Sequence, residues 1–277
     1  MVNGTPDKRK SFSSLGARVV TGVLYGLVLL GTIAFGGALG LALLLALFGG
    51  LALSELYRIT RRERRTLAEF CGLAAVVAMP LAAVALGLPG ILAVMTVLLV
   101  ASLIWHVAFT NLRISDTAVV VFGALYIGFA LAHLVLVRSL EDGVMLVLVL
   151  LVSVWASDVL AYFVGSLIGS HKLAPRISPN KSWEGFIAGL MGTVAVWLAL
   201  PLVVDVAPRT EFLLVIGVAV AVAALTGDLF ESRIKREVGV KDSGQLLPGH
   251  GGMLDRIDSL LLVSLVAYYA LLAGGIR

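Results

Sequence analysis

The sequence is poor in charge and almost without cysteine. Only 14% of its 277 residues are charged, whereas 60% are hydrophobic and the mean hydropathy is +1.03. A soluble domain cannot bury that much apolar surface, so lipid must be the solvent for most of the chain. Cys71 is the only cysteine, which excludes an intrachain disulfide and a cysteine-based zinc site. We expect Cys71 to be a small buried side chain.

Long apolar runs take the place of the missing charge, and they predict the fold. About 20 apolar residues cross a bilayer as a helix, and a backbone in lipid must satisfy its own hydrogen bonds. The runs therefore predict an all-α, polytopic integral membrane protein with about nine transmembrane helices. The predicted spans are 18–36, 38–57, 68–88, 89–109, 117–137, 143–169, 183–204, 211–232 and 253–273.

Basic residues predict the orientation of these spans. Lys and Arg gather in the N-terminal tail and in the loops that follow the second, fourth, sixth and eighth spans, whereas the other side holds only Arg138, Arg209 and Arg277. By the positive-inside rule the N-terminus is cytoplasmic, and an odd number of spans places the C-terminus outside. The net charge of +4 then reflects topology and anionic headgroups, so we expect no nucleic-acid partner.

Polar residues divide the chain into three parts. Residues 1–17 are predicted to be a cytoplasmic disordered tail, since the first 14 are polar and lack an apolar period. Residues 18–142 carry almost no ionisable groups within their spans, and we expect them to provide packing and a candidate dimer interface. Polar groups enter the spans of residues 143–277, which we expect to be the catalytic helices.

Asp158 lies deep in the sixth predicted span, where an unpaired charge is costly, so it is a candidate functional residue. Tyr162 follows one turn later and either donates to this carboxylate or anchors the helix near the membrane interface. The same helix has a stripe of small residues at four-residue spacing, which predicts close approach of another helix. The stripe consists of Ser157, Ala161, Gly165 and Gly169.

The next loop reads HKLAPRISPNKSWEG and is rich in cations. Ser178 and Pro179 suit a helix N-cap and the first helical position, so we expect the seventh span to start there. Lys181 and Ser182 would then lie in its first turn, where free N–H groups and the helix dipole favour phosphate. The alternative is a capped helix whose lysines serve only topology.

Acidic pairs stand at the end of the eighth span and at the start of the ninth. Asp228 and Glu231 are three residues apart, with Ser232 and Lys235 continuing the same helical face. Asp255 and Asp258 are also three apart, with Arg256 pointing away. A short link joins the two helices, so their acidic ends must be neighbours.

The link itself supplies groups that bind anions. Lys235, Arg236, Lys241 and His250 are donors, and the glycines of the PGHGG segment at residues 248–252 allow close backbone approach. Hard oxygen ligands beside such cations are what magnesium-assisted phosphoryl chemistry needs. The alternative is that Asp228 and Asp255 form structural ion pairs with Lys235, Arg236 or Arg256. Such pairs leave the PGHGG segment unexplained.

The stretch SRIKREVGVKDSGQLLPGHGGMLDRID, at residues 232–258, resembles the signature of phosphatidate cytidylyltransferases, also called CDP-diacylglycerol synthases. SPNKSWEG and the SD..AY pattern resemble further segments of this family. The resemblance implies transfer of the cytidylyl group of CTP to phosphatidic acid, giving CDP-diacylglycerol and pyrophosphate for phospholipid biosynthesis. It also implies Mg²⁺, optionally with a monovalent cation such as K⁺, a cytoplasmic-facing site in a bacterial inner membrane, and a homodimer.

Carried over residue by residue, the resemblance implies a catalytic set and a substrate-binding set. Asp228, Asp255 and Asp258 become the magnesium ligands, and Lys241 joins them in the catalytic set. The substrate-binding set consists of Asp158, Ser178, Lys181, Ser182, Ser232, Lys235, Arg236, Pro248, Gly249, His250, Gly251 and Gly252.

Two other functions use similar residues. A CTP-dependent lipid kinase would transfer the γ-phosphoryl group to a hydroxyl and would need a base beside it, and the signature argues against this. An ion-coupled transporter would use Asp158, Asp228 and Glu231 as a relay across the membrane. Against the transporter, the sequence has no evident internal repeat and its acids cluster at cytoplasmic helix ends.

Overall fold

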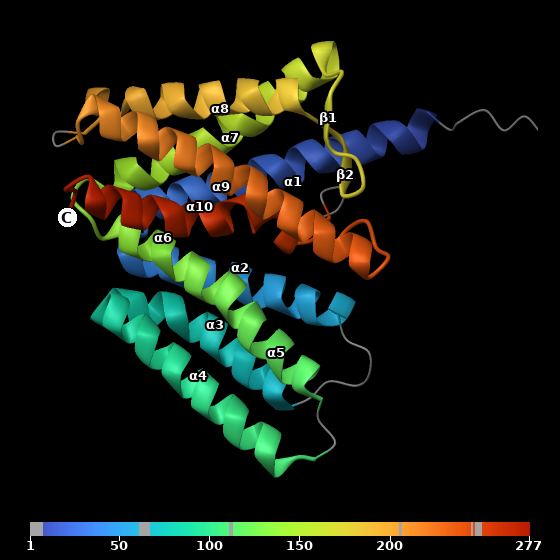
Figure 1. Cartoon of the computed structure of the whole chain (residues 1–277), viewed down its shortest axis with the longest axis vertical. Coiled ribbons are helices and arrows are strands. Elements are labelled where there is room, and N and C mark those ends of the chain that lie inside the picture. The colour runs from blue at the N-terminus through green and yellow to red at the C-terminus, as the bar shows by residue number, and fades with distance from the viewer. Residues whose placement is uncertain (1–7, 61–66, 111–112, 205–206, 245, 247–250) are drawn as a thin grey trace, which may run out of the picture.

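The fold is a bundle of helices that run back and forth across the molecule (Figure 1). The computed structural model describes residues 8–60, 67–110, 113–204, 207–244, 246 and 251–277. The helices are α1 (Lys8–Phe35), α2 (Gly37–Thr60), α3 (Leu67–Leu86), α4 (Leu88–Ala108), α5 (Ile114–Gly123), η1 (Ala124–Phe129), α6 (Ala130–Arg138), α7 (Gly143–Ile168), α8 (Trp183–Leu198), η2 (Leu200–Leu202), α9 (Thr210–Glu237) and α10 (Leu254–Ala273).

The helices confirm the predicted polytopic membrane fold. Eight helical stretches in the described residues are long and apolar enough to cross a membrane, and each matches one of the predicted spans from the second to the ninth. The first predicted span corresponds to α1, whose segment Gly22–Phe35 is apolar. The start of α1 and the end of α10 lie at opposite ends of the bundle (Figure 1).

The fifth span is one continuous crossing built from α5, the π-helical segment η1 and α6. Its glycines bring it close to its neighbours. A Cβ on Gly128 would lie 2.8 Å from Cα of Val76 on α3, so only glycine permits this contact. The span therefore forms the centre of the N-terminal half.

The small-residue stripe on α7 packs against α8, as its spacing predicts. A Cβ on Gly189 would lie 2.8 Å from the carbonyl oxygen of Ser157, and one on Gly185 would lie 2.6 Å from that of Ala161. Small residues on both helices let the two backbones approach this closely, which favours association in lipid. The two helices thus hold one wall of the site in a fixed position.

The segment between α7 and α8 is a β-hairpin, which the sequence analysis did not predict. Strand β1 (Lys172–Ala174) pairs antiparallel with β2 (Ser178–Ser182). The expected helix start at Ser178 is wrong, because α8 begins at Trp183 with Ser182 as its N-cap. Ser182 Oγ accepts a hydrogen bond of 3.2 Å from the Gly185 amide. The difference arises because residues 178–182 pair with β1, and this pairing keeps the backbone extended until Ser182.

Cys71 is exposed on α3, so the expectation that it is buried is also wrong. In a soluble protein a small apolar side chain gains free energy by leaving water. A side chain on the outside of a membrane bundle faces lipid instead, and lipid is as apolar as the protein interior. Hydrophobicity alone therefore does not predict which side chains of these helices are buried.

Candidate active site

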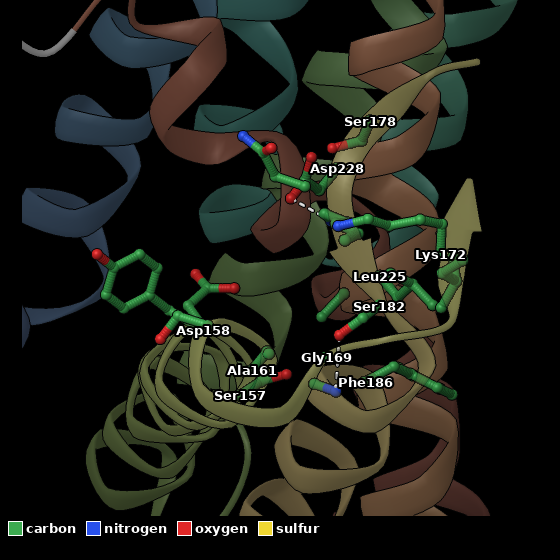
Figure 2. A pocket seen from close by; sticks show the side chains of 18 residues that line it. Ser157, Asp158, Ala161, Gly169, Lys172, Ser178, Ser182, Phe186, Leu225 and Asp228 are labelled. Carbon is green, nitrogen blue, oxygen red and sulfur yellow. Dashed lines mark hydrogen bonds and ion pairs between the residues drawn. The ribbon is translucent and has the colours of Figure 1, made fainter. Parts of the chain in front are cut away.

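A cavity of about 610 Å³ lies at the end of the bundle where the hairpin is found. The C-terminal part of α7, the hairpin, the start of α8 and the middle of α9 enclose it, and Figure 2 shows their side chains around it. Its main polar and charged lining residues are Asp158, Lys172, Ser178, Asn180, Lys181 and Asp228. A chamber with both signs of charge at one end of an apolar bundle is suited to a polar, charged substrate.

Lys181 and Asp228, which both line this cavity, form an ion pair. Lys181 comes from β2, and Asp228 lies on α9. Both side chains keep more than a quarter of their surface exposed, at 26% and 30%. Ser232 Oγ, one turn further along α9, donates to Asp228 Oδ1 at 3.3 Å. The pair thus remains accessible to a ligand inside the cavity.

Three carboxylates from three helices lie close enough for their charges to interact. They belong to Asp158 on α7, Asp228 on α9 and Asp258 on α10. Like charges in a poorly solvated place repel one another, so this part of the site favours a bound cation. Lys181 supplies one positive charge there.

The donor chemistry of this site fits magnesium when a substrate phosphate completes the shell. In the described part of the chain, no three His, Cys, Asp or Glu side chains lie close enough together to hold a metal ion by themselves. Mg²⁺ is commonly held by one or two carboxylates together with substrate phosphates and water. Asp228 and its acidic neighbours can provide such a partial shell of hard oxygens.

Asp255 lies in a second cluster, beside the loop that joins α9 to α10. Its Oδ1 accepts from Lys235 Nζ at 2.7 Å, and its Oδ2 accepts from the Ser243 amide at 3.0 Å, from Ser243 Oγ at 2.9 Å and from the Gly252 amide at 2.7 Å. Lys235 also pairs with Glu231 on its own helix. The acidic helix ends are therefore neighbours, as predicted, and Asp255 holds the loop in place. Its pair with Lys235 is one of the structural ion pairs that the sequence analysis gave as the alternative to a metal site.

Two residues of α2 complete this second cluster, and the sequence analysis missed them. Glu55 Oε2 accepts from Ser243 Oγ at 3.1 Å and from the Leu254 amide at 2.9 Å. Arg58 Nη2 donates to the Ser243 carbonyl oxygen at 2.8 Å. A signal was present, because Glu55 is the only acidic residue within the apolar run 38–57. An intramembrane carboxylate is a functional candidate wherever it occurs.

The remaining predicted site residues lie at the end of α9, on the α9–α10 loop or outside the described residues. Arg236 donates to the carbonyl oxygens of Ile177, at 3.4 Å, and Val240, at 3.1 Å, so it joins the hairpin to the end of α9. Lys241 is exposed on the loop. Gly251 has a φ of +83°, and Gly252 donates to Asp255. Pro248, Gly249 and His250 lie outside the described residues.

Tyr162 also lines the cavity. Its side chain is 71% exposed, and its ring lies edge-on to that of Phe163. This exposure favours the interfacial anchor over a fixed hydrogen bond to Asp158, the two roles that the sequence left open.

Fold and site together define a polytopic α-helical membrane protein with a charged chamber at one end of its bundle. Residues 16–273 match the cytidylyltransferase family, and the chain belongs to this family. It is 34% identical to the phosphatidate cytidylyltransferase of Bacillus subtilis over 262 residues, which are 92% of this chain and 96% of that protein.

Shorter alignments connect the chain with further proteins of the same name. It is 43% identical to the phosphatidate cytidylyltransferase of Staphylococcus saprophyticus over 148 residues, and 42% identical to that of Mycobacterium leprae over 154 residues. These alignments cover 53% and 55% of this chain, and 56% and 49% of the two relatives. The chain thus spans about half the length of these relatives.

Proposed function

We propose that this protein transfers the cytidylyl group of CTP to phosphatidic acid, giving CDP-diacylglycerol and pyrophosphate. The observation that carries the proposal is the Lys181–Asp228 pair, which lies in a cavity beside two further carboxylates in a chain of the cytidylyltransferase family. Cations that bind phosphate and carboxylates that attract a metal are the two kinds of group that this reaction needs.

The reaction follows from the charges of its substrates. A phosphate oxygen of phosphatidic acid attacks the α-phosphorus of CTP, a new P–O bond forms, and the bond from the α-phosphorus to the oxygen that bridges the α- and β-phosphates breaks. The nucleophile is already anionic at neutral pH, so no strong general base is required. The main obstacle is repulsion between two polyanions. Lys181 and Lys172 line the cavity and would reduce that repulsion during attack.

We propose that Asp228, Asp255 and Asp258 hold a magnesium ion together with the CTP phosphates. When bound, the ion would neutralise phosphate charge and stabilise the leaving pyrophosphate. Asp255 can contribute because its partner Lys235 has a second carboxylate partner in Glu231. Lys235 would therefore keep one carboxylate partner if Asp255 bound the ion.

The remaining proposals concern the surroundings of the enzyme. The positive-inside rule supports a cytoplasmic site in the inner membrane of a bacterium, since the hairpin and the C-terminal end of α9, which both carry lysine and arginine, lie at the end of the bundle that holds the cavity. A monovalent cation such as K⁺ beside magnesium and a homodimeric assembly are proposed from the resemblance described above.

One assay tests the reaction directly. Purified protein in vesicles that contain phosphatidic acid should release pyrophosphate from CTP and form CDP-diacylglycerol, and it should do so only in the presence of both substrates and a divalent metal. A lipid kinase would instead leave CDP, and a transporter would leave CTP intact. Either of these results would overturn the proposal.

A further inference from the structure

We propose that Glu55 and Arg58, two residues of the N-terminal half, position the α9–α10 loop for reaction with CTP. By this loop we mean its described residues, 238–244, 246 and 251–253. The inference rests on the proposed function for its kinetic consequences, whereas the structural link stands on contacts alone. Both residues act through the loop, so they are positioning residues.

The contacts join two helices, α2 and α10, to one serine of the loop. Ser243 Oγ lies 3.1 Å from Glu55 Oε2 and 2.9 Å from Asp255 Oδ2, while the Ser243 carbonyl oxygen accepts from Arg58. A hydroxyl has one proton, so at any moment it donates to one of the two carboxylates. The amides of Leu254 and Gly252 hold the two carboxylates in place. Ser243 is thereby clamped between α2 and the start of α10.

Two glycines of the loop make this clamp possible. A Cβ on Gly244 would lie 2.3 Å from Glu55 Oε1, and a Cβ on Gly252 would lie 2.4 Å from Glu55 Oε2. A side chain at either position would require the Glu55 carboxylate to move away. The Glu55 carboxylate thus occupies the space that the two glycines leave open, and the loop packs around a residue more than 180 positions away in the sequence.

The burial of the Glu55 carboxylate would destabilise the protein if the loop did not supply hydrogen-bond donors to it. Its side chain is only 6% exposed, in a helix that is long and apolar enough to span a membrane. A carboxylate in such a place is stabilised only by donors that point at it. Among the described residues, the donors to Glu55 are Ser243 of the loop and Leu254, the first residue of α10. An ordinary packing position would be filled by an apolar side chain.

The clamp connects the two halves of the chain at the α9–α10 loop. Asp255 is held by the same serine and also pairs with Lys235 of α9. A change at Glu55 would therefore reach a proposed magnesium ligand through Ser243. The N-terminal half then contributes to the reaction through geometry, in addition to packing.

The first experiment compares two neighbouring residues of α2. Glu55→Ala should lower kcat/KM for CTP about 10- to 100-fold, because it leaves buried donors unpaired and releases the loop. Its KM for CTP should rise while KM for phosphatidic acid stays unchanged. Ser54→Ala is the control and should behave as wild type, since, among the described residues, Ser54 Oγ bonds only to the Leu51 carbonyl of its own helix. Wild-type CTP kinetics in Glu55→Ala would overturn the kinetic part of the inference.

The second experiment measures the loop without using activity. In a Cys71→Ser background, Leu246→Cys reports on the loop by its rate of reaction with a membrane-impermeant maleimide, since Leu246 is 49% exposed. We expect Glu55→Ala to increase the labelling rate several-fold and Ser54→Ala to leave it unchanged. An equal rate in all three proteins would overturn the positioning role, whether or not the enzyme makes CDP-diacylglycerol. Increased labelling in a protein that releases no pyrophosphate would preserve the clamp and refute the proposed function instead.

A further variant covers the case in which Glu55→Ala fails to fold. Ser243→Ala removes the shared hydroxyl but leaves Glu55 with the Leu254 amide, so its cost in stability is smaller. We expect it to increase labelling at position 246 in the same direction. With Glu55→Gln it should give a combined loss of kcat/KM close to the larger single loss, because the two residues act as one unit. Additive losses would contradict the clamp.

Discussion

Lys181 on β2 is ion-paired with Asp228 on α9, 47 residues further along the chain. Asp228 therefore takes its cation from the hairpin, although α9 itself ends in several basic residues. The pairing ties the hairpin to the bundle and places one positive and one negative charge on the same cavity. A phosphate group that enters the cavity can replace Asp228 as the partner of Lys181 and leave the carboxylate for a metal.

The first prediction concerns this lysine. Lys181→Met keeps most of the side-chain length and removes the charge, so we expect kcat/KM for CTP to fall by about one to two orders of magnitude. The matched control is Arg233→Met. Its ion pair with Glu237 is exposed on both sides and should contribute little. Steady-state kinetics with CTP measures both variants, and equal kinetics in the two would remove Lys181 from the site.

The second prediction concerns the α9–α10 loop. Lys241→Ala should lower kcat/KM for CTP about 10- to 100-fold if the exposed lysine contacts phosphate. Gly251→Val should lower kcat/KM for CTP further, because Gly251 has a φ of +83° and a Cβ there would lie 2.8 Å from Asp255 Oδ2. Steady-state kinetics with CTP as the varied substrate measures both variants. A Lys241→Ala enzyme with wild-type CTP kinetics would show that phosphate recognition lies at Lys181 instead.

The third prediction concerns the packing of α7 against α8. Gly189→Ala should destabilise the protein by about 1 to 3 kcal/mol, because the added methyl group meets the Ser157 backbone. Gly31→Ala is the matched control, since a Cβ at Gly31 has no atom within 4 Å. Thermal unfolding in detergent compares the two variants. A Gly189→Ala protein as stable as Gly31→Ala would mean that the two helices adjust freely.

The fourth prediction concerns topology. Tags at the N-terminus and after Ile168 should be cytoplasmic, because they lie on the side that carries the basic loops, and a tag beyond Arg277 should be external. Protease protection in oriented vesicles or reporter fusions would show this. A cytoplasmic C-terminus would mean that one of the predicted spans does not cross the membrane.

The fold was largely predictable because lipid imposes a simple rule on sequence. Each apolar run of sufficient length had to be a helix, and the α7–α8 contact followed from small residues at four-residue spacing. The hairpin was not predictable in this way. Ser178 and Ser182 are both acceptable N-caps, and sequence alone does not show that the chain remains extended between them.

Site residues that are close to one another in the sequence could be predicted. Those whose partners are far along the chain could not. Asp228, Asp255 and Asp258 stood out as charges at helix ends. Glu55 did not, because its partners come from a loop far along the chain and only the fold brings them together. The Lys181–Asp228 pair was not predicted for the same reason, since its two residues belong to separate sequence motifs.

The last prediction distinguishes the two acidic residues that we propose as metal ligands. Asp228→Asn and Asp255→Asn should both abolish turnover in a protein that stays folded in detergent, since each removes a charge from the proposed magnesium site. The two variants should differ in their effect on the α9–α10 loop. Asp255 accepts four hydrogen bonds from Lys235, Ser243 and Gly252, and an asparagine amide can accept with only one of its two polar atoms.

The loop cysteine at position 246 therefore separates the two variants, because Asp255→Asn should speed its labelling whereas Asp228→Asn should not. Magnesium titration supplies the other measurement. If the carboxylates bind the ion, any turnover that reappears in either variant should do so only at a magnesium concentration well above that of the wild type, because a lost ligand weakens binding. An Asp255→Asn enzyme with increased labelling and an unchanged magnesium requirement would show that Asp255 only anchors the loop. Retained turnover with unchanged magnesium dependence in Asp228→Asn would place the metal away from the cavity altogether.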